Sequence, residues 1–396
     1  MEQQHARSNV VRLAICQALA GANASVIFAT GAVVGATLSP NPALATLPIS
    51  VFVVGMAACT LPAGWLARRH GRRAAFLAGT GCGTLAGLVA ALAVVLGSFP
   101  LFCMGTFFGG VYAAVVLSFR FAAADCVADP GARARALSFV MAGGVFAGVI
   151  GPQLVNFTMG LWPPYLFAAS YVAQAAVALL SMAVLAGVRL PPVAASGTHG
   201  GRPLGLIARQ PRFVAAVVVG AVTYLVMNFL MTSAPLAMRL CGLTQGDSNL
   251  GLQWHIIAMY GPSFFTGSLI ARFGAARVVS SGLLLLAGSC AVGLSGLSVL
   301  HFWGTLILLG LGWNFAFVGA SAMVLGCHRP EERTRVQALN DFLVFGTMTV
   351  GSFASGGLLT AFGWSVVCWV ALPPLVVALV ALIATGAFRR IAAVPA

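Results

Sequence analysis

Long uninterrupted apolar blocks constrain this chain more than any other feature of its sequence. Sixty per cent of the 396 residues are hydrophobic and 7% are charged. The hydrocarbon core of a bilayer is about 30 Å thick, and a helix of about 20 residues crosses it. Because lipid offers no hydrogen-bond partner to a backbone group, each block must be helical. The sequence therefore predicts an all-α membrane protein.

The order of the apolar blocks predicts twelve spans. We place them near residues 10–37, 45–67, 74–97, 101–125, 136–160, 163–188, 213–238, 250–271, 276–298, 302–326, 338–362 and 364–388. The longest hydrophilic stretch, rich in proline and glycine, indicates a linker. We expect an N-terminal six-helix bundle over 1–188, a cytoplasmic linker over 189–212 and a C-terminal six-helix bundle over 213–396.

The placement of arginine predicts the topology. The chain has no lysine, and every arginine except Arg120 and Arg239 falls in alternate connections between spans. The positive-inside rule then places both termini in the cytoplasm, as expected for a multi-pass protein of the cell inner membrane. The net charge of +14 follows this pattern and does not indicate nucleic acid. Without lysine there is no P-loop ATPase motif, so transport energy must come from a gradient or a partner subunit.

Two loops of the first half recur in the second. Residues 64–71 align with 267–274, and residues 129–135 align with 329–335, at offsets of 203 and 200. Matched loops at nearly one offset, in the same topological position, indicate duplicated six-helix bundles in parallel orientation. We expect the two halves to be related by an axis along the membrane normal.

The first of these loops resembles the signature loop of the major facilitator superfamily, and the resemblance covers the whole chain. The family sequence is roughly Gly-x-Leu-Ala-Asp-Arg-x-Gly-Arg-Arg, and the matching residues here are Gly64, Arg69, Gly71, Arg72 and Arg73. Arg68 replaces the family's aspartate, which in relatives helps to latch the cytoplasmic side. The resemblance implies the twelve-helix fold of that family and transport by alternating access.

The resemblance also implies a contact between Arg72 and Asp125 that holds spans two and four together. An exposed ion pair worth under about 1 kcal/mol is the alternative. Gly143, Gly144, Gly148 and Gly151-Pro152 partly match the glycine-rich motif of proton-driven exporters. Close helix packing through small residues explains these glycines equally well.

In this family spans one, four, seven and ten line the central cavity. Candidates on these spans are Asn23, Thr30, Tyr112, Tyr224, Asn228, Trp313 and Asn314, with Gln253, Tyr260 and Asn340 as rim contacts. Amides offer donors and acceptors, and aromatic rings offer flat apolar faces. The set suits a small, partly aromatic organic solute, although each member alone also fits a helix–helix hydrogen bond.

Three ionisable side chains in or near spans are candidates for coupling or gating, because such groups in lipid face cavities or partners. Arg120 either binds an anionic group, pairs with Asp341, or extends to the cytoplasmic interface. Asp341 either caps the start of span eleven or carries a proton. His255 is placed to titrate near neutral pH, or it packs as a hydrogen-bonded core residue.

These features predict a secondary transporter for a small organic solute. Efflux with proton coupling and uptake of a nutrient, such as a vitamin or organic anion, both remain open. A membrane enzyme would need clustered acids or histidines at membrane depth, which the sequence lacks. A non-transporting receptor that kept the fold is the remaining alternative. We expect a monomer in the lipid bilayer, with no cofactor, metal or nucleic acid; the nine scattered cysteines fit apolar packing.

Overall fold

The computed structural model describes residues 2–116, 118–119, 122–123, 126–127, 130–190, 202–329 and 332–385. Over these ranges the chain is helical and contains no strand. Nine of the described helices are long and apolar enough to cross a membrane. The predicted all-α membrane fold is confirmed.

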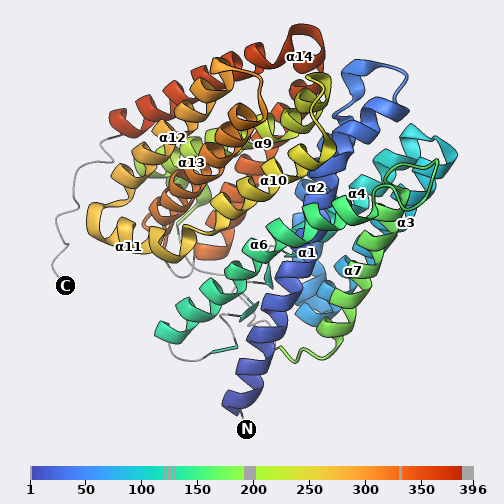
Figure 1. Cartoon of the computed structure of the whole chain (residues 1–396). Helices are drawn as coiled ribbons and strands as arrows, with labels where there is room; N and C mark the ends of the chain where they lie inside the picture. The colour runs from blue at the N-terminus through green and yellow to red at the C-terminus, as the bar shows by residue number, and fades with distance from the viewer. Residues whose placement is uncertain are drawn as a thin grey trace, which may run out of the picture.

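The helices form two groups along the chain (Figure 1). The N-terminal half contains α1 (Glu2–Leu38), the short 3-10 helix η1 (Pro42–Leu44), α2 (Leu47–His70), α3 (Arg72–Leu96), α4 (Phe99–Val116), α6 (Pro130–Thr158) and α7 (Ala168–Ala186). The C-terminal half contains α8 (Leu204–Ala208), α9 (Pro211–Leu240), α10 (Gln245–Tyr260), α11 (Ser263–Phe273), α12 (Ala275–Ser295), α13 (Val299–Leu325) and α14 (Arg333–Ala384).

Two predicted spans differ from single straight helices. Predicted span eight is divided between α10 and α11, because the helical hydrogen bonds are interrupted at Gly261 and Pro262, where proline has no N–H to donate. Predicted spans eleven and twelve lie in α14, which turns at Gly363, where φ is 80° and ψ is 179°. Only glycine adopts such a conformation without strain, so this residue marks the boundary expected between the two spans.

The duplicated loop has the same backbone geometry in both halves. Gly71 ends α2 and begins α3 with φ 85° and ψ 157°, and Gly274 ends α11 and begins α12 with φ 88° and ψ 148°. These glycines occupy equivalent positions of the sequence repeat. The shared left-handed φ explains why both copies keep a glycine there.

Helices α6 and α10 cross the boundary between the halves as an antiparallel pair, and we call their contact the seam. From the end where α6 finishes, the facing pairs are Asn156 with Asn249, Gln153 with Gln253, Gly148 with Ile256, and Gly144 with Tyr260. Helix α1 also packs against α9, and α2 against α14. Figure 1 shows α1, α6 and α10 near the middle of the molecule. We call the end where α1, α6 and α9 finish the distal end.

Hydrogen bonds attach each end of the linker to the half that lies next to it. The side-chain amide of Asn9 donates to the carbonyl of Arg189 at 2.6 Å, and Arg73 donates to the carbonyl of Ala186 at 2.5 Å. In the other half, the Arg202 guanidinium donates to both carboxylate oxygens of Glu332, at 2.9 and 2.8 Å. These hydrogen bonds fix residues 186–189 to the first half and Arg202 to the second.

Glu332 precedes α14 and is fully buried. Its carboxylate also accepts from the backbone N–H groups of Arg202 and Arg329, at 2.7 and 2.9 Å. The hydrogen bonds from the Arg202 side chain, followed by those from the two backbone groups, hold the pKa of this carboxyl well below its usual range. The charged form is therefore the one that the fold stabilises.

Candidate functional site

Five aromatic side chains from four helices meet inside the C-terminal half. This aromatic cluster consists of Tyr224 on α9, Tyr260 on α10, Trp313 and Phe317 on α13, and Phe345 on α14. The rings of Trp313 and Phe317 stack at 5.1 Å with an interplanar angle of 18°. Tyr224 meets both of them edge-on, at 5.3 and 4.8 Å. Tyr224, Tyr260 and Phe317 remain partly exposed, so the cluster offers ring surface to a solute.

Unpartnered polar atoms lie beside the aromatic cluster. Asn228 is fully buried, and neither its amide nitrogen nor its oxygen has a hydrogen-bond partner among the described residues. The indole nitrogen of Trp313 and the hydroxyl of Thr232 also lack a hydrogen-bond partner among the described residues. Thr232 lies one turn beyond Asn228 on α9. Residues 224, 228 and 232 share one face of α9, because helical neighbours recur every three to four residues. Buried polar groups without partners are costly, so their presence here indicates a place for a ligand or water.

The N-terminal half meets this cluster with glycine. A Cβ atom at Gly144 would lie 3.0–3.1 Å from the ring of Tyr260, and one at Gly148 would lie 2.8 Å from Ile256. The absence of side chains lets α6 approach α10 closely at this end of the seam. The predicted close packing of these glycines is therefore present in the structure.

Toward the distal end, the seam is polar. Gln153 donates to Gln253 at 2.8 Å, and Asn249 donates to Asn156 at 2.5 Å. Gln245 donates to Asn249 at 2.9 Å and to the Ala29 carbonyl of α1 at 3.2 Å. We call these five side chains (Gln153, Asn156, Gln245, Asn249 and Gln253) the polar bridge. It joins the halves through uncharged hydrogen bonds, which break and reform at low cost when water replaces them.

Three cavity candidates on the N-terminal half point elsewhere. The amide oxygen of Asn23 accepts from Gln174 at 2.9 Å, Thr30 shares a hydrogen bond with the Tyr171 hydroxyl at 2.7 Å, and Tyr112 donates to Ser181 at 3.1 Å. All of these partners lie on α7 of the same half. Residues 23 and 30 are seven positions apart and so share one face of α1. These contacts match the helix–helix alternative for the three side chains, and their place in the cavity stays a prediction.

Asn314 supports the break in the predicted eighth span. Its amide donates to the Met259 carbonyl at 2.6 Å and to Ser263 at 2.8 Å, and its oxygen accepts from Thr266 at 2.6 Å. Neighbouring side chains often supply the hydrogen bonds that a broken membrane helix needs. With these bonds made, Asn314 is a brace between α13 and α10–α11, not an open group in a cavity.

His255 is fully buried between α10 and α13. Its Nδ1 lies 2.7 Å from the Leu306 carbonyl, so this nitrogen is the donor, since a carbonyl oxygen only accepts. The other ring nitrogen has no partner within the described part of the chain. This position matches the packing alternative for His255, and its role in coupling stays a prediction.

The predicted gate lies partly outside the described residues, which do not include Arg120 or Asp125. Asp341 accepts from the Asn340 amide at 3.1 Å and lies more than two turns inside α14, which begins at Arg333. The prediction that Asp341 caps this helix is therefore wrong, because the helix starts earlier. Its role as a gate or proton carrier stays a prediction.

The signature loop forms the tight connection between α2 and α3. Gly64 and Arg68 lie in the last turns of α2, Gly71 supplies the turn, and Arg72 begins α3. Arg69 is exposed, with its guanidinium 5.3 Å from the Trp65 ring. Arg73 holds the end of α7, where a cation is favourable. A latch between Arg72 and Asp125 stays a prediction.

Sequence reasoning missed Phe317, Phe345 and most of the polar bridge. Phe317 lies four residues after Trp313, and this spacing was a usable signal because it places both rings on one face of α13. Asn156 was not among the candidates that the sequence offered. Its partner Asn249 lies in the other half of the molecule, so no local sequence pattern reveals the pair.

The sequence matches the Major Facilitator Superfamily over residues 13–262 and 256–393. The chain belongs to the major facilitator superfamily. Its described architecture resembles a partially occluded inward-open structure of the Escherichia coli xylose transporter XylE, with a TM-score of 0.74 and 13% identity. That match covers 95% of this chain and 97% of the other, and it concerns the fold alone.

Several relatives in this superfamily are carriers by name. The chain is 46% identical over 381 residues, 96% of each protein, to the riboflavin transporter RfnT of Brucella anthropi. It is 31% identical to the uncharacterized MFS-type transporter YdeG of Bacillus subtilis, over 87% of this chain and 84% of that protein. It is 26% identical to the multidrug resistance protein MdtL of Escherichia coli, over 74% of each. This member of the major facilitator superfamily is therefore a secondary transporter that resides in a membrane.

Proposed function

We propose that this transporter takes up riboflavin, or a solute with a similar flat ring system, across the inner membrane. The observation that carries the proposal is the aromatic cluster with unpartnered polar atoms beside it. A flavin ring is flat and aromatic, and its pyrimidine edge carries carbonyl and N–H groups. Stacking on aromatic side chains stabilises such a ring, and buried amides select its polar edge. The name of the relative at 46% identity agrees with this chemistry.

Within this proposal the C-terminal half holds the ring. Tyr224 and Phe317 supply partly exposed ring surface, and Trp313 lies behind them with its indole N–H unpartnered among the described residues. Asn228 on the next turn of α9 offers a donor and an acceptor to the polar edge. Gly144 on α6 leaves room for Tyr260 to move aside as the halves rock.

The predicted topology orients the polar bridge in this proposal. With both termini in the cytoplasm, as the arginine pattern predicts, the distal end faces the periplasm. The polar bridge then closes the periplasmic side, and opening it admits solute to the aromatic cluster. Uptake fits a vitamin better than the alternative of efflux, which is supported only by the more distant multidrug resistance relative and the partial glycine motif of α6.

Coupling is proposed to be either absent or carried by a proton on Asp341, the acid within the apolar part of α14, with His255 as the alternative carrier. Replacing Asp341 with Asn distinguishes the two. A proton-coupled carrier loses accumulation against a gradient but keeps exchange of labelled for unlabelled solute. A facilitator shows no accumulation against a gradient in the wild type or the variant, and both keep exchange.

The proposal is tested in a bacterial strain that cannot synthesise riboflavin. Expression of the chain should restore growth at low external riboflavin and give saturable uptake of radiolabelled riboflavin. Expression of the Trp313→Ala variant at the same membrane level is the matched control. Lower cellular riboflavin on expression of the wild-type chain would support efflux and overturn uptake. Equal uptake with and without the chain would overturn riboflavin as the solute.

A further inference from the structure

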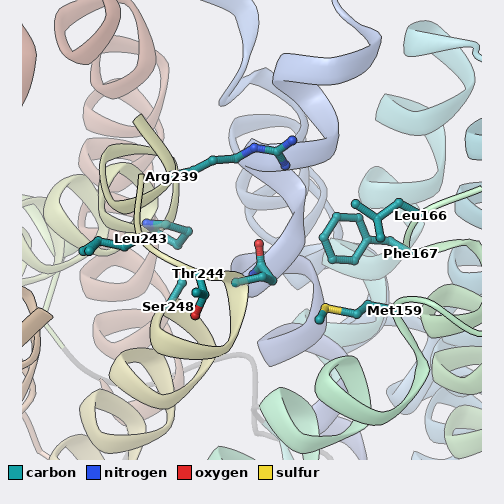
Figure 2. Close-up of a pocket in the computed structure, with 9 residues that line it drawn as sticks. Met159, Leu166, Phe167, Arg239, Leu243, Thr244 and Ser248 are labelled. Carbon is teal, nitrogen blue, oxygen red and sulfur yellow. The ribbon is translucent and has the colours of Figure 1, made fainter. Parts of the chain in front are cut away.

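A cavity lies at the distal end, between the two halves and away from the aromatic cluster. It has a volume of about 230 Å³ and is lined by Met159, Leu166, Phe167, Pro235, Arg239, Leu243, Thr244, Gln245 and Ser248. Figure 2 shows Met159, Leu166 and Phe167 of the N-terminal half on one side and the residues of α9 and α10 on the other. We call this cavity the outer pocket.

The walls of the outer pocket are apolar, but its mouth carries a cation. Figure 2 shows the side chain of Arg239 extending from the end of α9 toward the wall that carries Leu166 and Phe167. Arg239 is exposed, and its guanidinium makes no hydrogen bond or ion pair with any described residue. Arg239 is also one of two arginines that depart from the positive-inside pattern. A cation placed against the topological rule, with no structural partner, indicates a role in binding.

A buried hydroxyl gives the pocket a second polar group. Ser248 is 3% exposed, lines the pocket, and its Oγ has no hydrogen-bond partner within the described ranges. Helix α10 is already capped by Thr244 and Asp247, which bond each other's backbone N–H groups. The Ser248 hydroxyl is therefore not needed to begin the helix and remains available to a bound molecule.

The outer pocket adjoins the polar bridge. Gln245 belongs to both, because it lines the pocket and donates to Asn249 and to the Ala29 carbonyl. A solute in the pocket thus lies directly in front of the hydrogen bonds that join the halves. From the distal end, the order is the pocket, then the bridge, then the aromatic cluster.

We propose that the outer pocket is a separate binding site for a flat apolar solute that carries a phosphate or carboxylate. An apolar cavity of about 150 Å³ holds a benzene ring, so the larger outer pocket accepts a ring system with its anionic group at the mouth. Arg239 pairs with the anion in the fork geometry that guanidinium favours, and Ser248 hydrogen-bonds the buried part. The inference uses the proposed function only for the pocket's orientation toward the periplasm.

Binding of riboflavin 5′-phosphate to the purified full-length protein in nanodiscs tests this site, with riboflavin as the uncharged comparison. Arg239→Gln should weaken binding of the phosphate by about tenfold, the usual effect of losing one charge-assisted contact. It should leave riboflavin binding within about twofold. Ser248→Ala should weaken both ligands by a smaller factor. The matched control is Arg277→Gln, an exposed arginine at the opposite end, which should change neither.

The lipid composition separates a soluble anion from a lipid headgroup. In nanodiscs of phosphatidylcholine and of phosphatidylglycerol, the phosphate should bind with similar affinity at equal ionic strength. If phosphatidylglycerol weakens binding of the phosphate to the wild type, and Arg239→Gln removes this difference between lipids, the site belongs to a lipid headgroup and the proposal is overturned. Equal binding of the phosphate by wild type and Arg239→Gln would also overturn it. Because binding is measured without transport, either result is independent of whether riboflavin is carried.

Discussion

The two halves share the loop geometry at Gly71 and Gly274, yet they present different surfaces to each other. The C-terminal half offers the aromatic cluster and the unpartnered amide of Asn228. The N-terminal half offers Gly144 and Gly148 at the same level, while Asn23 and Thr30 of α1 hydrogen-bond to α7. This contrast teaches that duplication fixes the helix framework but not the chemistry. In this account one half holds the solute while the other slides across it.

The seam shows the same division along its length. At the distal end, Asn156 and Asn249 bond each other, whereas near the aromatic cluster glycine meets Tyr260. A polar contact between uncharged groups exchanges readily with water, and a glycine surface adapts to a moving ring. Along the seam, a polar contact that can separate lies at the distal end, and a glycine surface over which the Tyr260 ring can move lies near the aromatic cluster.

The comparison is tested most severely by substituting one aromatic residue in each half. Trp313→Ala should lower the riboflavin uptake rate at low substrate by about thirtyfold, because a stacked ring at the centre of a site contributes about 2 kcal/mol. Tyr112→Phe, which removes a hydroxyl bonded to Ser181 in the N-terminal half, should lower it by less than about twofold. Uptake measured at equal membrane expression checks both. A large loss with Tyr112→Phe would mean that both halves hold the solute.

The glycine surface is tested by adding bulk to it. Gly144→Val should reduce uptake by about tenfold, because its side chain would meet the Tyr260 ring at contact distance and overpacking costs about 1–3 kcal/mol. The matched control is Gly357→Ala on α14, where a Cβ meets nothing within 4 Å. Initial uptake rates compare the two. Normal uptake by Gly144→Val would show that close approach of α6 is not required.

Asn228 separates binding from folding. Asn228→Leu should weaken riboflavin binding by about fivefold, since the ring's polar edge loses a partner. The same change should keep or raise the thermal stability of the free protein, because a buried amide without a partner is replaced by an apolar side chain of similar volume. Equilibrium binding and thermal denaturation in detergent give the two values. Lower stability together with unchanged binding would make Asn228 a structural residue.

Glu332 should have the smallest effect on transport. At neutral pH, Glu332→Gln should lower the melting temperature while riboflavin binding stays unchanged, because Glu332 lies outside the proposed site. The depressed pKa means that its stabilisation is present above the unfolded pKa of about 4.3 and is lost as pH falls through the folded pKa. The difference in melting temperature between wild type and variant should therefore shrink below about pH 4. A difference that is constant from pH 7 to pH 3 would contradict the assignment.

Most of the fold was predictable because membrane helices are specified locally. Apolar block length set the spans, and the repeated loops at Gly71 and Gly274 placed the duplication. Gly261 and Pro262 give this interruption a visible local cause, yet the predicted eighth span runs through both residues as one continuous helix. The sequence did not say that Asn314 would supply the missing hydrogen bonds.

The candidate site was predictable only in part. Tyr224, Trp313 and Asn228 were selected from the helices expected to line a cavity, and the structure places the first two in one cluster. Asn23, Thr30 and Tyr112 were selected by the same rule but face α7. Residue type and depth are readable from sequence. The face of a helix that meets the centre depends on its neighbours, and α1 and α4 are buried on several sides.

Fluorescence of riboflavin added to the purified protein tests the central claim most directly. A flavin ring stacked on tryptophan or tyrosine loses fluorescence by electron transfer. The account predicts saturable quenching by the wild-type protein, loss of that quenching when Tyr224 and Trp313 are both replaced by Ala, and normal quenching with Tyr112→Phe. Binding without quenching, or quenching that survives replacement of both Tyr224 and Trp313, would contradict the assignment of the ring to the aromatic cluster of the C-terminal half.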